Sequence, residues 1–113
     1  MQDFAVQSHR VGDRTVLRVT GELDVATAPH LDAAAHDALS TGCPLVVDLS
    51  TCTFLDSTGA RAVGLVARAG ARAGAAVALV CPPSARIPRR VVDHVGLAVV
   101  VPVVDTLDEA LRA

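Results

Sequence analysis

"VVDLSTCTFLDSTGARAVGLVARAG", residues 46–70, begins as an apolar run and ends with apolar residues spaced three to four positions apart. The first pattern is typical of a buried strand, and the second of a helix that packs through one face. The change falls at D-S-T-G, residues 56–59. Ser57 at such a helix start has three possible roles: a helix cap, a catalytic nucleophile, or an acceptor for a phosphate.

The same two patterns alternate through the rest of the chain. Strands are expected at residues 4–9, 15–20, 45–49, 75–80 and 97–103. Helices are expected from Pro29 to the stop signals at Gly42 and Pro44, from Ser57 to Ala73, from Pro88 to Gly96, and over residues 105–113. The last helix carries two overlapping capping-box patterns, Asp105 with Asp108 and Thr106 with Glu109.

The order of these elements predicts the fold class. Gly12 and Asp13 mark a tight turn, so the first two strands should form an antiparallel hairpin. The later strands alternate with helices, which favours parallel pairing through right-handed crossovers. We therefore expect an α/β fold, a mixed sheet of about five strands with about four helices. A chain of 113 residues should form one domain, residues 1–113.

Composition excludes several classes of partner. The formal net charge is −2, and only 2% of the residues are aromatic. Nucleic-acid binding is therefore not expected, because it needs basic patches or aromatic stacking platforms. Insertion into a membrane is not expected either, because no apolar run approaches the roughly 20 residues that span a bilayer. The N-terminal segment lacks the apolar core of a secretion signal, and the three cysteines have no metal-like spacing. These features predict a cytoplasmic protein with reduced thiols.

The candidate chemistry for catalysis is weak. All ten basic residues are arginine, which removes phosphate-loop, Schiff-base and serine–lysine mechanisms. A serine hydrolase elbow, G-x-S-x-G, would need glycine where Leu55 stands, although His94 could be imagined as a base. His30 and His36 are six residues apart and do not share a helical face, so no metal site is expected. We expect no cofactor and no enzymatic activity.

The expected helix from Ser57 to Ala73 has two distinct faces. One is made of small and apolar residues suited to lying close on a sheet: Gly59, Val63, Val66, Ala67 and Gly70. Arg61, Arg68 and Arg72 fall together on the opposite side, with Leu65 beside them. A single exposed leucine is ordinary. Beside a serine at the head of the helix and three arginines, however, Leu65 suggests a docking surface for a protein partner.

Four stretches of the chain resemble the STAS domain of bacterial anti-sigma factor antagonists, in order and without large gaps. They are "TGELDVATAPHL" (20–31), "VVDLSTCTFLDSTGARAVGLVARA" (46–69), "RRVVDHVGL" (89–97) and "VVDTLDEALRA" (103–113). The most specific elements are G-E-L-D at 21–24 and D-S-T-G at 56–59. Two departures are Ala60, where the family often has leucine, and Pro88 early in the third helix; both concern packing and choice of partner.

The resemblance implies a partner switch. In this family the serine at the position of Ser57 is phosphorylated by an anti-sigma factor that is itself a serine kinase. The unphosphorylated protein binds this kinase and releases a sigma factor, and phosphorylation switches the binding off until a PP2C-type phosphatase removes the phosphate. Asp24 would belong to a loop near the serine. The expected partner-binding residues are Asp24, Asp56, Thr58, Gly59, Arg61, Leu65 and Arg68, and the free protein is expected to be a monomer.

Two other functions stay open on the sequence. A STAS module can bind its partners constitutively, as a scaffold or as part of a transporter or signalling complex. A small serine hydrolase that uses Ser57 is the more remote alternative. A phosphate on Ser57 in protein from its own host would separate the switch from the scaffold, and covalent labelling of Ser57 by a fluorophosphonate would identify a hydrolase.

Overall fold

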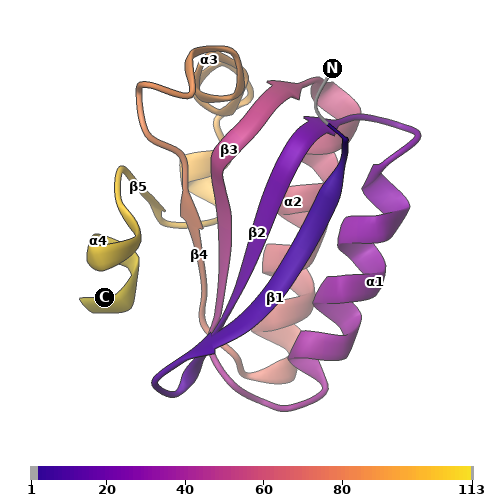
Figure 1. Cartoon of the computed structure of the whole chain (residues 1–113). Coiled ribbons are helices and arrows are strands. Elements are labelled where there is room, and N and C mark those ends of the chain that lie inside the picture. Colours follow the sequence, from indigo (N-terminus) through magenta and orange to yellow (C-terminus); the bar gives the residue numbers. More distant parts are fainter. Residues whose placement is uncertain (1–2, 113) are drawn as a thin grey trace.

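A computed structural model describes residues 3–112 of the chain, and within them a mixed five-stranded sheet forms the centre of the fold (Figure 1). The strands are β1 (Ala5–Val11), β2 (Arg14–Leu23), β3 (Leu45–Leu55), β4 (Val77–Val80) and β5 (Val103–Val104). β1 pairs antiparallel with β2, and every later pair is parallel. The spatial order is β1-β2-β3-β4-β5, the same as the order along the chain. The predicted hairpin and mixed α/β sheet are confirmed.

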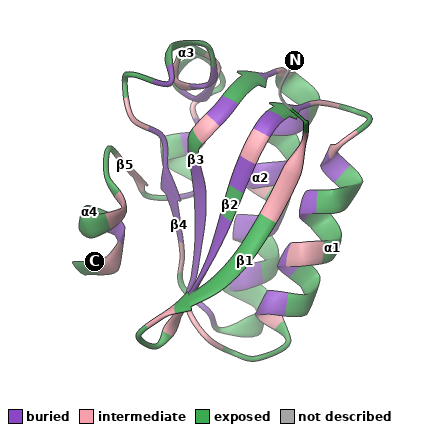
Figure 2. Cartoon of the chain, viewed as in Figure 1, coloured by how far each residue is buried: buried purple, intermediate pink, exposed green. Residues whose placement is uncertain are grey.

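The helices cover the two faces of the sheet unequally. They are α1 (Ala28–Leu39), α2 (Ser57–Ala73), α3 (Arg86–Val95), the short 3₁₀ helix η1 (Leu97–Val99) and α4 (Leu107–Arg112). Alternate residues of a strand point to opposite faces, so Val47 packs in the large core with α1 and α2 while Val46 packs in a smaller cluster with Ala110 of α4. Figure 2 shows that β3 and β4 are buried along most of their length.

Helix α2 packs on the sheet through the face that the sequence predicts. All five residues of that face are buried, whereas Arg61, Arg68 and Arg72 are exposed. Gly59 shows how close the contact is, because a Cβ atom there would collide with the carbonyl oxygen of Leu23. The helix ends at Gly74, which has a left-handed backbone (φ 72°).

Two central strands are longer than predicted. The sequence indicates strands at 15–20 and 45–49, but β2 runs to Leu23 and β3 to Leu55. Leu23 and Leu55 pair with each other, so each extension supplies the backbone partners of the other. The continuation of β3 could not be recognised from the sequence, because the polar side chains in residues 50–53 interrupt the apolar run. β4, by contrast, begins at Val77 rather than at residue 75, because the Ala75 N–H still bonds to the carbonyl of Gly70 at the end of α2.

The prediction of a strand over residues 97–103 is wrong for most of its length. After Gly96 the chain makes the 3₁₀ turn of η1, in which the N–H groups of Val100 and Val101 donate to the Leu97 carbonyl at 3.0 Å each. Only Val103 and Val104 remain as a strand. The third helix begins at Arg86, two residues before Pro88, whose missing N–H is not needed in a first helical turn.

Hydrogen bonds fix the C-terminal elements in place. Thr106 and Glu109, one of the two predicted capping-box pairs, are hydrogen-bonded: the Glu109 N–H donates to Thr106 Oγ1 at 3.2 Å, and the Thr106 hydroxyl donates to Glu109 Oε1 at 3.2 Å. Asp105 has a different role, since its carboxylate accepts from Arg89 at 2.7 Å. Ala113, the last residue of the predicted helix, lies outside the described residues. Between residues 3 and 112 no helix is long and apolar enough to cross a membrane.

Candidate functional site

The site begins at the junction between the end of β3 and the start of α2. Asp56 is the helix cap: its Oδ1 accepts the N–H of Gly59 at 2.9 Å, and its carbonyl accepts the N–H of Ala60 at 2.9 Å. These bonds satisfy backbone donors that a helix start otherwise leaves unpaired. Ser57 is the first residue of the helix and is exposed, and no hydrogen bond of its hydroxyl occurs within the described residues. The capping role therefore falls to Asp56 and leaves the Ser57 hydroxyl accessible.

A second carboxylate lies at the same edge of the sheet. Leu23 and Leu55 are paired residues of adjacent parallel strands, so Asp24 and Asp56 each follow directly after a strand end. The tight contact between Gly59 and the Leu23 carbonyl holds the loop that starts at Asp24 against the first turn of α2. The structure thus places the start of the Asp24 loop beside the first turn of α2, in the arrangement that the resemblance to the STAS family implies.

Asp24 also shapes its own loop. Its Oδ1 accepts the N–H groups of Ala26 at 3.0 Å and Thr27 at 3.2 Å. Thr27 Oγ1 in turn accepts the N–H of Asp24 at 2.9 Å and donates to the Glu22 carbonyl at 2.7 Å. This reciprocal pair is a local turn that competes with further strand structure and ends β2. A substitution at Asp24 would therefore alter the loop as well as any contact that its carboxylate makes.

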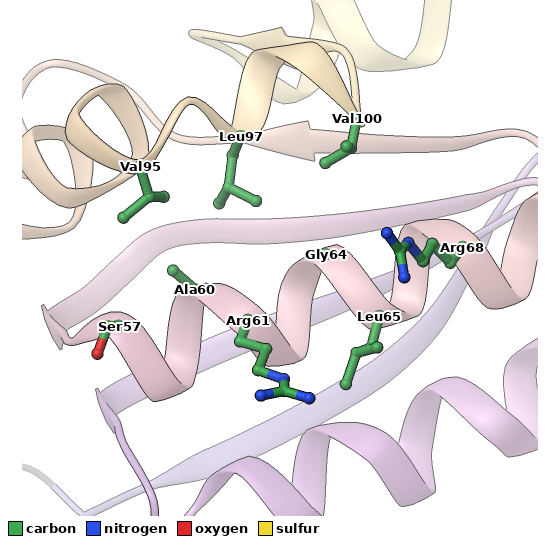
Figure 3. Close-up of a pocket in the computed structure, with 9 residues that line it drawn as sticks. All are labelled: Ser57, Ala60, Arg61, Gly64, Leu65, Arg68, Val95, Leu97 and Val100. Carbon is green, nitrogen blue, oxygen red and sulfur yellow. The ribbon is translucent and has the colours of Figure 1, made fainter.

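Ser57 lies at one end of a groove of about 390 Å³ that runs between α2 and the segment formed by α3 and η1 (Figure 3). We call it the α2–η1 groove; its lining residues are Ser57, Ala60, Arg61, Gly64, Leu65, Arg68, Val95, Leu97 and Val100. Ser57 and three of the seven predicted partner-binding residues, Arg61, Leu65 and Arg68, therefore share one concave surface. The other four, Asp24, Asp56, Thr58 and Gly59, are not part of the lining.

The far wall of the groove was missed by the sequence analysis. Val95 of α3, Leu97 of η1 and Val100, the residue after η1, project toward α2 (Figure 3). The apolar run that contains Leu97 and Val100 reads as a buried strand, which conceals that Val100 is 51% exposed. Gly96 is the one feature of the sequence that could have indicated this wall. A glycine directly before an apolar run can end a helix and be followed by another turn instead of a strand.

Leu65 lies on the exposed ridge of α2. Its side chain is 45% exposed, and it lines both the α2–η1 groove and a second groove between α1 and α2. The predicted helical phase, which keeps Leu65 out of the core, is confirmed. Arg61 and Arg68 are also exposed, and neither forms an ion pair with any residue in the described part of the chain.

The geometry around Ser57 gives no support for catalysis. A serine nucleophile needs a general base within hydrogen-bond reach, and none of the hydrogen bonds found in residues 3–112 joins Ser57 to a histidine. In the same residues no cluster of three or more histidine, cysteine, aspartate or glutamate side chains is arranged to hold a metal ion. What the site offers is an exposed hydroxyl, two nearby carboxylates and a groove.

The fold and the site define a small α/β domain in which an exposed serine, three exposed arginines and the half-exposed Leu65 lie along one helix. The chain belongs to the STAS domain family, whose model matches residues 5–110. No curated protein matched the sequence significantly.

Solved structures with this fold include anti-sigma factor antagonists. One, from Mycobacterium paratuberculosis, has a TM-score of 0.82 and 30% identity over 97% of this chain and 92% of its own. The Bacillus cell fate determinant SpoIIAA in its phosphorylated form has a TM-score of 0.68 and 25% identity over 96% of this chain and 97% of its own. The anti-sigma factor antagonist SpoIIAA in its unphosphorylated form shares the fold, with a TM-score of 0.69 and 22% identity over 96% and 94%.

Proposed function

We propose that this chain is a cytoplasmic anti-sigma factor antagonist that is switched by phosphorylation of Ser57. The unphosphorylated form binds an anti-sigma factor with serine kinase activity and so releases a sigma factor. Phosphorylation by that kinase ends the binding, and a PP2C-type phosphatase restores it. Membership of the STAS family and the likeness to solved anti-sigma factor antagonists support this role, which requires no catalytic activity of the chain itself.

The observation that carries the proposal is that Asp56, and not Ser57, caps helix α2. Asp56 caps the helix, so the Ser57 hydroxyl is exposed at the first helical position with no structural bond to break. A phosphate on Ser57 adds about −1.5 to −2 charges. Free backbone N–H groups and the helix dipole favour negative charge at this position, so the fold should accept the phosphate.

A bound partner would not accept it. A phosphate at the contact surface stands close to the Asp56 carboxylate and near the Asp24 loop, and it would add bulk, like-charge repulsion and a large desolvation cost to the docked state. A loss of about 3–4 kcal/mol corresponds to a several-hundred-fold weaker complex, because 1.4 kcal/mol is tenfold. The switch therefore follows from the position of the serine and needs no change in fold.

The test is intact-mass and tandem mass spectrometry of the protein purified from its own host. We expect a population carrying one phosphate, on Ser57, and no such population in the Ser57→Ala variant. Ser50, Ser84 and Thr58 serve as internal controls in the same spectra. A phosphate that persists on another hydroxyl in Ser57→Ala would contradict the assignment. Complete absence of phosphate in both proteins under every growth condition would favour a constitutive interaction module instead.

A further inference from the structure

The α2–η1 groove exposes more apolar surface than the fold requires. The described residues contain seven exposed large apolar side chains, and three of them, Leu65, Val95 and Val100, line this one groove. Val99, beside Val100, is 88% exposed. Scattered exposed apolar residues are ordinary, but a contiguous patch marks a surface that another molecule covers.

Gly64 lies at the floor of the groove, and packing within the chain does not require a glycine there. At Gly59 and Gly70 of α2, an added Cβ atom would collide with a backbone carbonyl or a side chain of the sheet layer. At Gly64 it would lie 3.7 Å from Leu97 Cδ2, which is ordinary van der Waals contact. Glycine inside a helix is destabilising. The space above Gly64 is thus available to an occupant although it weakens α2.

The charges along the groove have one sign. Arg61 and Arg68 both line it, neither has an ion-pair partner in the described residues, and no acidic side chain is among the lining residues. This is a local feature, because the whole chain carries a net charge of −2. An occupant with acidic side chains would complement this surface, and one with basic side chains would be repelled.

We infer that the α2–η1 groove binds an amphipathic helix of the partner, with an apolar face flanked by acidic side chains. The lining from Ser57 to Arg68 spans about 16 Å at 1.5 Å per residue, which is about three helical turns. Apolar anchors at positions i, i+4 and i+7 of the partner helix fit such a length. The inference rests on the proposed function for the identity of the partner, an anti-sigma factor, and it specifies what that partner presents to this chain.

Charge also decides against a second copy of the chain as the occupant. A two-fold dimer through this groove would bring the same patch from both copies together. Arg61 and Arg68 of one copy would then face the same arginines of the other, without acidic residues in the groove to pair with them. A distinct partner with acidic flanks avoids this repulsion.

The test uses two synthetic peptides and needs neither kinase nor phosphate. One is a 15-residue helical peptide with leucine at positions 4, 8 and 11 and glutamate at the flanking positions; the other has lysine in place of every glutamate. Each is titrated into the isotope-labelled protein, and amide chemical shifts are followed by NMR. We expect the glutamate peptide to bind at least tenfold more tightly, with the largest shifts at Gly64, Leu65, Arg68 and residues 95–100.

Two variants supply the controls. Arg68→Glu should weaken binding of the glutamate peptide at least tenfold and strengthen binding of the lysine peptide. Arg72→Glu is the matched control, because Arg72 is exposed on the same helix but does not line the groove, and it should leave both affinities unchanged. Gly64→Leu should fill the groove from within and abolish binding while the protein stays folded, as circular dichroism would show.

Each other outcome overturns the inference. Equal affinity for the two peptides would remove the role of charge. Shifts centred on Asp32 and His36 would place the occupant in the groove between α1 and α2. A dimer in sedimentation equilibrium that Val100→Asp dissociates would make a second copy the occupant. No saturable shift at millimolar peptide would mean that the groove binds no such helix. None of these four outcomes bears on the phosphorylation of Ser57, which mass spectrometry tests separately.

Discussion

Gly59 and Gly64 lie five residues apart in α2 and have opposite surroundings. Gly59 faces the sheet, where the Leu23 carbonyl and the Leu55 side chain leave no room for a Cβ atom. Gly64 faces the α2–η1 groove, where a Cβ atom would fit against Leu97. The first glycine is imposed by packing within the chain. Packing within the chain does not require the second glycine, Gly64. One face of α2 is therefore determined by the fold, and the face along the groove is available to a partner.

The largest effect should come from forcing a side chain into the packed face. Gly59→Ala should lower the free energy of unfolding by about 3 kcal/mol, because the carbonyl of Leu23 belongs to a paired strand and cannot move aside. Urea denaturation measures this. Gly70→Ala is the comparison, since its nearest obstacle is the Val77 side chain and the loss should be smaller. A Gly59→Ala protein as stable as the wild type would mean that the packed face is not tight.

The groove face should respond in binding and not in stability. Leu65→Asp should weaken the complex with the anti-sigma factor by about 1–3 kcal/mol, as loss of a partly exposed apolar anchor would. The melting temperature should change little, because Leu65 is 45% exposed. Val66→Asp, one residue further along, is the matched control and should unfold the domain, since Val66 is buried in the core. If Leu65→Asp unfolds the protein too, the distinction between the faces fails.

The ionisation of the Cys81 thiol, which is buried in the core, tests whether water reaches that core. Burial raises the pKa of Cys81 from 9.0 to about 11. The unfolded chain loses this proton at lower pH than the folded chain, so the thiol's contribution is fully present below pH 9 and is lost as the pH rises through 11. The full loss should be about 3 kcal/mol, at about 1.4 kcal/mol per unit of pKa difference over two units.

Urea denaturation at pH 8 and pH 10.5 measures this pH dependence. Cys81→Ala should show a smaller decline than the wild type, with the remainder coming from Cys52, whose pKa burial also raises. Cys43 is the comparison within the chain, because it is only half-buried and should react with iodoacetamide at neutral pH far faster than Cys81 does. Equal reaction rates for the two thiols would indicate that water reaches the core.

Filling the floor of the groove by one methyl group should stabilise the protein. Gly64→Ala should raise the free energy of unfolding by about 0.5–1 kcal/mol, because alanine is the better helix former and its methyl group meets no obstacle. Thermal and urea denaturation would both detect it. A decrease in stability would show that the space above Gly64 is less open than the distance to Leu97 indicates.

The smallest change in stability should come from a charge at Ser57. Ser57→Asp gains about 0.3–1 kcal/mol from the helix dipole, which repulsion from Asp56 offsets. Ser57→Ala should also be near neutral, because Asp56 and not Ser57 caps the helix. The two variants should differ in binding: the Asp variant should bind the anti-sigma factor more weakly than the Ala variant. Equal dissociation constants at one salt concentration would show that charge at Ser57 is not the switch.

The packed face of α2 could be predicted from the sequence, and the groove opposite it could not. Spacing alone identifies Val63, Val66 and Gly70 as one buried stripe, because a helix repeats every 3.6 residues. Val100 belongs to a run that fits a buried strand equally well, and only the left-handed turn at Gly96 decides between strand and 3₁₀ turn. A groove also needs two walls from distant parts of the chain, and periodicity carries no information on which segments meet.

The order of the strands has a consequence for how the protein is made. Each strand pairs with the one synthesised just before it, so the sheet can grow in step with translation. No early strand has to wait on the ribosome for a later one to insert beside it, as happens in sheets with a switched order. The growing edge ends at β5, which is only two residues long and offers few free backbone groups to other chains. The edge on the β5 side of the finished sheet is therefore too short to pair extensively with another chain.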